Sequence, residues 1–149
     1  HFYLPKSLHF ILPVTYEGYV KALEENGIKL DKELCRFGSF KSEYGYEMEM
    51  EILNSHNDVD GIFCASDMIA IGAMKAVIEK GLKIPADVKI VGFDDIYISA
   101  YLNPALTTVK QPIYSIGSEA AKLLIESIEN SKEKTSIVLE TELVIREST

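Results

Sequence analysis

The 149-residue sequence has no long hydrophobic run, no paired-cysteine motif and little positive charge. No apolar stretch approaches the ~20 residues that a membrane-spanning helix needs. The formal net charge of −8 disfavours contact with a phosphate backbone, so this chain is not expected to bind nucleic acid by itself. Cys35 and Cys64 lie far apart in apolar contexts, without CxxC spacing or a secretion signal. They predict reduced thiols in a cytoplasmic protein rather than a disulfide.

The motifs of common catalytic and cofactor sites are also missing. The sequence has no GxSxG nucleophile motif, no P-loop and no GxGxxG dinucleotide fingerprint. His1, His9 and His56 show no i,i+4 pairing with each other or with a neighbouring cysteine, so we expect no metal site. With 47% hydrophobic and 26% charged residues, the composition is that of one globular domain. We expect a protein without cofactor or catalytic activity.

Short apolar runs alternate with helical patterns over the first hundred residues. Runs of this kind, joined by helices, are typical of a parallel sheet covered on both faces. The pattern therefore predicts a doubly wound α/β fold. The expected strands are residues 8–12, 33–40, 59–65 and 88–93, and the expected helices are 15–27, 42–56, 67–81 and, weakly, 96–102.

The last forty or so residues break this alternation. A short β-rich run, residues 105–111, ends at Pro112 and is followed by a long helix over residues 113–130. Its residues Ile113, Ile116, Ala120, Leu124 and Ile128 lie near one face. Residues 136–149 alternate in polarity, which predicts an edge or linking strand with one wet face.

Ligands of open α/β sheets bind beyond the carboxyl ends of the strands, where loops and helix N-termini converge. The residues at these ends offer a stacking surface, hydroxyl and carboxylate acceptors, and an amide. Such a set suits a small polyhydroxylated or heterocyclic molecule, whose polar groups need partners once desolvated. The residues are Phe40, Ser66, Asp67, Asp94, Asp95 and Gln111.

Each of these residues also has a purely structural interpretation. Ser66 and Asp67 both fit the role of N-cap for the helix that follows them. Asp94 and Asp95 fit a general acid and base or a magnesium site, but Asp95 fits a cap or turn residue better than a catalyst. Phe40 fits a lid over the core as well as a ligand platform.

The helix expected over residues 67–81 has an unusually narrow polar face. After Asp67 its strongly polar residues are Lys75, Glu79 and Lys80 alone. A helix packed only against its own sheet has a wider wet face, so this helix is expected to contact a second partner. Cover by a neighbouring loop of the same chain is the alternative.

Linked motifs give the sequence a family resemblance. They are "GIFCASDMIAIGAMKAVIEKGLKIPADVKIVGFDD", "NPALTTVKQP", "GSEAAKLL" and "LVIREST". Over residues 15–149 the chain resembles the carboxyl-terminal part of the effector-binding region in the lactose and galactose repressor family. That family has an N-terminal helix-turn-helix domain and two α/β lobes that close on a small effector.

The resemblance implies a periplasmic-binding-protein-like lobe of flavodoxin-like topology and a single, partial effector-binding domain over residues 1–149. Residues 1–111 then form most of the second lobe. Residues 112–130 are the crossing segment and a helix that leads toward the first lobe, and residues 131–149 form a tail strand. Neither the first lobe nor the DNA-binding domain is present in this chain.

The same resemblance proposes site residues. The effector contacts it implies are Phe40, Ser66, Asp94 and Gln111, together with Thr15, which stands where the family commonly has an arginine. Without that arginine, a bidentate donor is absent at this position. Second lobes of the family pair in dimers, which implies contacts at Ile71, Met74, Tyr101 and Leu102.

The function that follows is the effector-binding and dimerisation part of a bacterial transcription repressor that senses a small molecule, a sugar or sugar derivative. Its partners are the effector, a second copy and, through the absent N-terminal domain, operator DNA, with no membrane. The location is cytoplasmic. The alternative is a lobe of an extracytoplasmic solute-binding protein that feeds a transporter. An upstream helix-turn-helix or an upstream signal peptide distinguishes the two.

Overall fold

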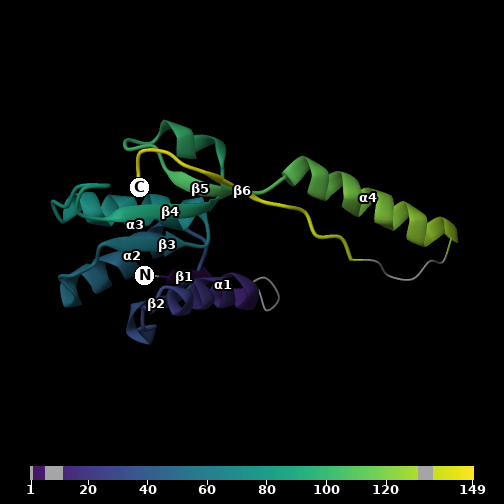
Figure 1. Cartoon of the computed structure of the whole chain (residues 1–149). Coiled ribbons are helices and arrows are strands. Elements are labelled where there is room, and N and C mark those ends of the chain that lie inside the picture. The colour runs from purple at the N-terminus through teal and green to yellow at the C-terminus, as the bar shows by residue number, and fades with distance from the viewer. Residues whose placement is uncertain (1, 6–11, 131–135) are drawn as a thin grey trace.

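The computed structural model describes residues 2–5, 12–130 and 136–149, and these contain a six-stranded sheet with the order β2-β1-β3-β4-β5-β6 (Figure 1). Strands β1 to β5 run parallel, and β6 is antiparallel to β5 at the edge. The parallel order 2-1-3-4-5 is that of flavodoxin-like folds and confirms the predicted topology. The strands are β1 Phe2–Pro5, β2 Cys35–Gly38, β3 Gly61–Cys64, β4 Lys89–Asp94, β5 Thr107–Lys110 and β6 Glu142–Val144.

The first strand differs from the prediction. We expected it at residues 8–12, of which 8–11 lie outside the described residues, while Leu12 begins a helix. The first strand is instead β1, second from the edge of the sheet, which pairs with β2 on one side and β3 on the other. The apolar run 8–12 therefore misplaced the strand, because periodicity alone does not separate short strands from helix starts.

The helices follow the predicted alternation. They are α1 Leu12–Glu25, α2 Ser42–Ser55, α3 Asp67–Glu79 and α4 Ile113–Asn130, with the short 3-10 helices η1 Lys32–Leu34 and η2 Tyr97–Tyr101. Gly27 and Gly81 follow α1 and α3 with φ of 68° and 77°, the left-handed conformation that ends helices at glycine. The weak helical pattern of residues 96–102 corresponds to η2.

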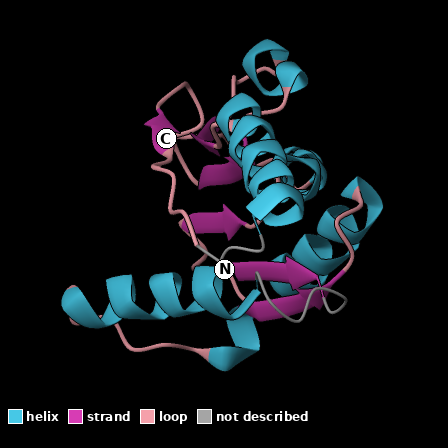
Figure 2. Ribbon diagram, turned by 90° about the vertical axis from the view of Figure 1, so that its right-hand side faces the viewer, coloured by secondary structure: helices cyan, strands magenta, loops and turns pink. Residues whose placement is uncertain are grey.

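Helices cover both faces of the sheet (Figure 2). Successive strand residues point to opposite faces. Ile62 and Cys64 of β3 lie in the main core with the residues of α2 and α3, whereas Phe63 packs in a second cluster with Tyr16 and Tyr19 of α1. α1 therefore lies on the face opposite α2 and α3, which is the doubly wound arrangement.

α2 covers much of the apolar surface of α3. A Cβ at Gly72 would overlap the carbonyl oxygen of Ser42, and one at Gly45 would overlap that of Ile69, so these two glycines let the helix backbones approach closely. Part of the second partner that we expected for α3 is thus a neighbouring helix of the same chain. Met68 and Ile78 remain exposed on α3.

α4 stands apart from the sheet (Figure 1). Ile113, Ile116, Leu124 and Ile128, which the sequence places near one face, are all exposed. After α4, residues 136–149 return to the sheet and pair with β5 through β6, at the edge position that the alternation predicted. An 18-residue helix with this much uncovered apolar surface lacks its packing partner within the described residues.

Within the part of the chain that the structure describes, no helix combines the length and apolarity needed to span a bilayer.

Candidate functional site

Three of the five predicted effector residues meet at the carboxyl ends of β3, β4 and β5. Asp94 is the last residue of β4 and pairs in register with Lys110 of β5, which brings Gln111 alongside. Gln111 Nε2 donates a hydrogen bond to Asp94 Oδ1 at 2.7 Å. Ser66, which follows β3 after one residue, also hydrogen-bonds the Asp94 carboxyl group. The three residues that were chosen because they follow the carboxyl ends of strands therefore form one cluster.

The Asp94 carboxyl group is half-buried, and burial raises its pKa above the ordinary value. The hydrogen bonds from Gln111 and Ser66 lower the pKa, while the charge of Asp67 raises it further. Desolvation leaves the carboxylate with fewer hydrogen bonds than water would supply. Such a group is a strong acceptor for ligand hydroxyl or N–H groups that enter the same space.

The backbone at Asp94 and Asp95 lies in an uncommon conformation. Their φ angles are 113° and 53°, in a region that side-chain-bearing residues rarely occupy. Each such residue costs on the order of 1–3 kcal/mol and persists only where the surroundings hold it. The turn after β4 thus presents the Asp94 carboxylate at a local cost in stability, a feature that clusters at binding sites.

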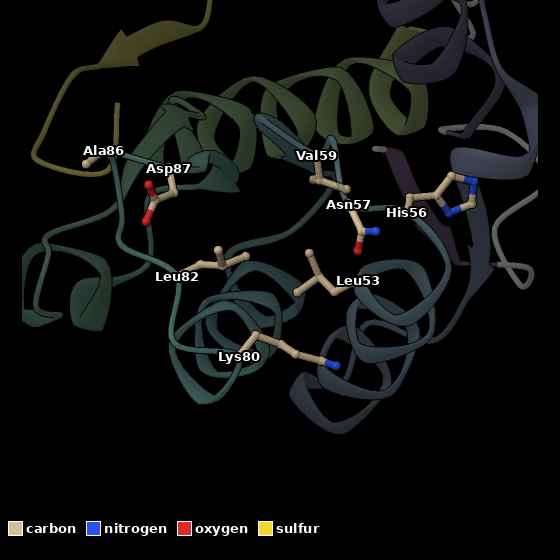
Figure 3. Close-up of a pocket in the computed structure, with 8 residues that line it drawn as sticks. All are labelled: Leu53, His56, Asn57, Val59, Lys80, Leu82, Ala86 and Asp87. Atoms are coloured by element: carbon tan, nitrogen blue, oxygen red, sulfur yellow. The ribbon is translucent and has the colours of Figure 1, made fainter.

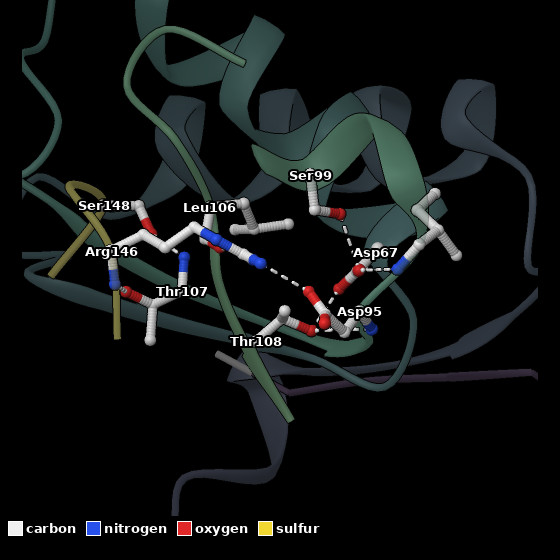
Figure 4. A network of polar contacts seen from close by, with 9 residues as sticks. Asp67, Asp95, Ser99, Leu106, Thr107, Thr108, Arg146 and Ser148 are labelled. Carbon is white, nitrogen blue, oxygen red and sulfur yellow. Dashed lines mark hydrogen bonds and ion pairs between the residues drawn. The ribbon is translucent and has the colours of Figure 1, made fainter. Parts of the chain in front are cut away.

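Asp67 is the buried centre of a polar network below this turn (Figure 4). Its Oδ2 accepts hydrogen bonds from Ile96 N (2.9 Å) and Ser99 Oγ (2.6 Å), and its Oδ1 accepts one from Thr108 Oγ1 (2.5 Å). The helix cap is Ser66, whose Oγ accepts a bond from Met68 N. Of the two capping candidates, only Ser66 thus fills that role, and Asp67 joins α3 to β5 and to the turn.

Asp95 is a turn residue that pairs with the tail of the chain. Its Oδ1 lies 2.6 Å from Arg146 Nη2, and its N–H donates to Thr108 Oγ1 at 3.3 Å (Figure 4). The sequence analysis predicted neither the contact of Arg146 with Asp95 nor the three hydrogen bonds that Asp67 accepts. In the structure, Gly92 of the "VGFDD" motif leaves room for the Asp67 carboxylate, because a Cβ at Gly92 would overlap Asp67 Oδ1.

The remaining two predicted effector residues lie in the other half of the sheet. Phe40 follows β2 just before α2 and is 37% exposed. Thr15 lies in α1, the helix that follows β1. Strands β1 and β3 separate the end of β2 from that of β4, a span of about 14 Å at the usual strand spacing. Phe40 and Thr15 thus lie at the end of the sheet where the parallel strands have their carboxyl ends, but outside the Asp94 cluster.

A groove of about 640 Å³ opens at the opposite end of the sheet (Figure 3). Leu53 and His56 line it from the end of α2, Lys80 from the end of α3, and Asp87 from the loop before β4. It contains none of the predicted effector residues. Within the described residues, no group of three or more His, Cys, Asp or Glu side chains is arranged to hold a metal ion.

A second groove, of about 320 Å³, lies on α3 and gathers three of the four predicted dimer residues. Ile71 and Met74 line it together with Ile78, and Leu102 closes it from beyond η2. Met74 is only 4% exposed and belongs to the main core, so it forms the floor of the groove. Tyr101 is 66% exposed and its ring lies 4.7 Å from that of Tyr97, centroid to centroid.

The raised pKa of Asp94 predicts a pH-dependent stability difference between the wild type and Asp94→Asn. A carboxyl group with a higher pKa in the folded state binds more protons folded than unfolded, so its contribution to stability falls as pH rises. The fall spans the interval from the ordinary carboxyl pKa up to the raised one. Asp94→Asn, which keeps the oxygen acceptor for Gln111, should therefore be the more stable protein at pH 7.

This difference is measured by urea unfolding of both proteins from pH 3 to pH 7. The gap between them should narrow as pH falls and Asp94 becomes protonated in both states. If the wild type were more stable than Asp94→Asn at pH 7, the ionised Asp94 carboxylate would not destabilise the folded state, and this account of Asp94 would be wrong.

The chain is similar to known transcriptional regulators. A family model described as periplasmic binding protein-like domain matches residues 14–149. The HTH-type transcriptional regulator MalR of Clostridium butyricum is 43% identical over 132 residues, which are 89% of this chain and 39% of MalR. The HTH-type transcriptional repressor PurR of Pasteurella multocida is 41% identical over 134 residues, 89% of this chain and 40% of PurR. The chain thus spans about two fifths of the length of these relatives.

Solved structures agree with this relationship. The transcriptional regulator CelR, in complex with cellobiose, superposes with a TM-score of 0.91 at 32% identity, over 99% of this chain and 46% of that one. Fold, motifs and relatives point to the same group of proteins. The chain therefore belongs to the periplasmic-binding-protein-like domain family and, within it, to the effector-binding region of LacI-family regulators.

Proposed function

We propose that this chain is the effector-binding and dimerisation part of a bacterial DNA-binding transcription repressor that senses a small molecule. The observation that carries the proposal is the cluster of Ser66, Asp94 and Gln111 at the carboxyl edge of the sheet. It supplies a half-buried carboxylate, an amide and a hydroxyl that are already oriented toward one another. Groups of this kind bind ligand hydroxyls by hydrogen bonds.

A sugar or sugar derivative is the ligand class that fits best. Phe40 contributes an aromatic surface at the same edge, and Thr15 a second hydroxyl. Carboxylate and amide hydrogen bonds suit a ring with several hydroxyl groups, and the aromatic surface of Phe40 suits stacking against another part of such a ligand. The CelR–cellobiose complex, a close structural relative, makes cellobiose the first probe to test.

In the proposed domain organisation, residues 1–111 form most of the second lobe of a two-lobe sensor. Residues 112–130 cross to the first lobe, and residues 131–149 return as a tail strand. The exposed apolar residues of α4 support this arrangement, because a first lobe packed on Ile116, Leu124 and Ile128 would bury them. Return of the chain as antiparallel β6 fits a segment that leaves the lobe and comes back.

The proposed dimer contact uses the exposed side of α3 and the region of η2. Met68 and Ile78 are exposed on α3, and Ile71 and Ile78 line the groove that Leu102 closes. An exposed apolar stripe beside an apolar groove suits a self-complementary contact across a two-fold axis. Because Ser66 begins the same helix that Ile71 and Ile78 occupy, we propose that α3 links the effector site to the dimer contact. The sensor would act in the cytoplasm, where operator DNA is found.

Effector binding is tested by calorimetric titration of the full-length gene product with cellobiose, maltose, glucose and hypoxanthine. We expect a saccharide to bind and Asp94→Ala to weaken that binding about 10- to 100-fold, the effect of losing hydrogen bonds to a charged group. Asp58→Ala is the matched control, since Asp58 is exposed at the opposite sheet edge and should leave affinity unchanged. Equal losses in both variants, or tight binding that survives Asp94→Ala, would refute the site.

The dimer contact is tested by sedimentation velocity of the full-length protein with Ile71→Glu and Ile78→Glu. A carboxylate at the centre of an apolar interface should cost about 2 kcal/mol or more in association and shift the protein to monomer. Ile28→Glu places the same charge at an exposed isoleucine away from α3 and should leave the dimer intact. If both α3 variants remain dimeric at the wild-type dissociation constant, the interface lies elsewhere.

A further inference from the structure

Three side chains hold the turn that presents Asp94. The N–H of Ile96 donates to Asp67 Oδ2 at 2.9 Å, and the N–H of Asp95 donates to Thr108 Oγ1 at 3.3 Å. The Asp95 side chain pairs with Arg146 Nη2 at 2.6 Å. These contacts fall on the two residues directly after Asp94, so they fix the direction in which the chain leaves β4 (Figure 4).

We propose that Asp67 and Arg146 are positioning residues of the effector site. By holding Asp95 and Ile96, they keep the turn in its left-handed conformation and so keep the Asp94 carboxylate beside Ser66 and Gln111. This inference rests on the proposed role of Asp94 as an effector ligand. It adds two residues to the site that do not themselves touch the ligand, one of them in the carboxyl-terminal tail.

Arg146 is itself held firmly enough to play this part. Its backbone N–H donates to Thr107 Oγ1, and Nη1 donates to the carbonyl oxygen of Leu106, both at 2.8 Å. The guanidinium therefore reaches Asp95 from a fixed base on β5. The side chains of Arg146 and Asp95 are only 18% and 15% exposed, so water screens their ion pair less than it screens a surface pair.

Asp67 holds the turn at Ile96, one residue beyond the Asp95 that Arg146 holds. It is fully buried, and its carboxylate is bound by Thr108 of β5 and Ser99 of η2 as well as by Ile96. The bonds from Thr108 and Ser99 therefore hold both carboxylate oxygens independently of the bond from the Ile96 N–H. A turn with two adjacent residues at positive φ needs such independent holds, because neither residue favours that conformation by itself.

The alternative is that Arg146 only anchors the tail. Ser148 gives a matched control for that role, because its Oγ donates to the carbonyl oxygen of Ile90 and accepts from Thr107 N, and it makes no contact with Asp95 in these bonds. Ser148→Ala should loosen the tail without releasing the turn. Arg146→Met and Asp95→Asn should release the turn, and Arg146→Lys should restore part of the hold, because it keeps the charge next to Asp95.

The test measures the Asp94 carboxyl group directly, by NMR titration of its carboxyl carbon in the 149-residue chain. In the wild type its pKa should be raised, and in Arg146→Met and Asp95→Asn it should fall toward the ordinary value as the turn opens to water. The Ile96 amide should exchange with solvent about tenfold faster or more in the same variants, the change expected when one charge-assisted hydrogen bond is lost. Ser148→Ala should change neither quantity.

The positioning role is overturned if the Asp94 pKa and the Ile96 exchange rate in Arg146→Met match the wild type, or if Ser148→Ala changes them equally. Neither readout needs an effector. A failure of wild-type full-length protein to bind cellobiose or the other probes would count against the proposed function, and the titration would still decide whether Arg146 and Asp95 hold the turn.

Discussion

The hydrogen bonds of the buried Asp67 carboxylate are the interactions on which the rest of the site depends. A charge removed from water is costly unless hydrogen bonds replace its hydration. Thr108, Ser99 and the Ile96 N–H supply those bonds, and each comes from a different segment: β5, η2 and the turn after β4. The position of Asp67 in the first turn of α3 adds the favourable field of the helix N-terminus. One charge therefore fixes the relative positions of four segments.

This constraint explains features of the sequence that are otherwise unrelated. Gly92 leaves room for the Asp67 carboxylate, since any side chain there would overlap Oδ1. The glycines at 45 and 72 let α2 lie directly on α3, which holds the helix that carries Asp67. α3 therefore lies between the proposed effector residue Ser66, which caps its N-terminus, and the proposed dimer groove along its exposed side. A shift of α3 would therefore move residues of both the proposed effector site and the proposed dimer groove.

The sequence allowed much of the fold to be predicted, because apolar runs and helical periods of the 149 residues mark most strands and helices directly. The cluster of Ser66, Asp94 and Gln111 followed from the rule that parallel strands end at one sheet edge. The first strand was misplaced: Leu12, the last residue of the expected strand, begins α1, and β1 lies at Phe2–Pro5. The ion pair of Asp95 with Arg146 was not predictable, because 51 residues separate them and they come together only when the tail pairs with the sheet.

The central claim is that the effector binds at the carboxyl edge of the parallel strands through Asp94. The most direct measurement is a crystal structure of the full-length protein with the effector that calorimetry identifies. The account predicts the ligand between two closed lobes, with its polar groups within hydrogen-bonding distance of Asp94 and Ser66 or Gln111. A ligand found instead in the groove beside His56 and Lys80, at the other end of the sheet, would contradict it.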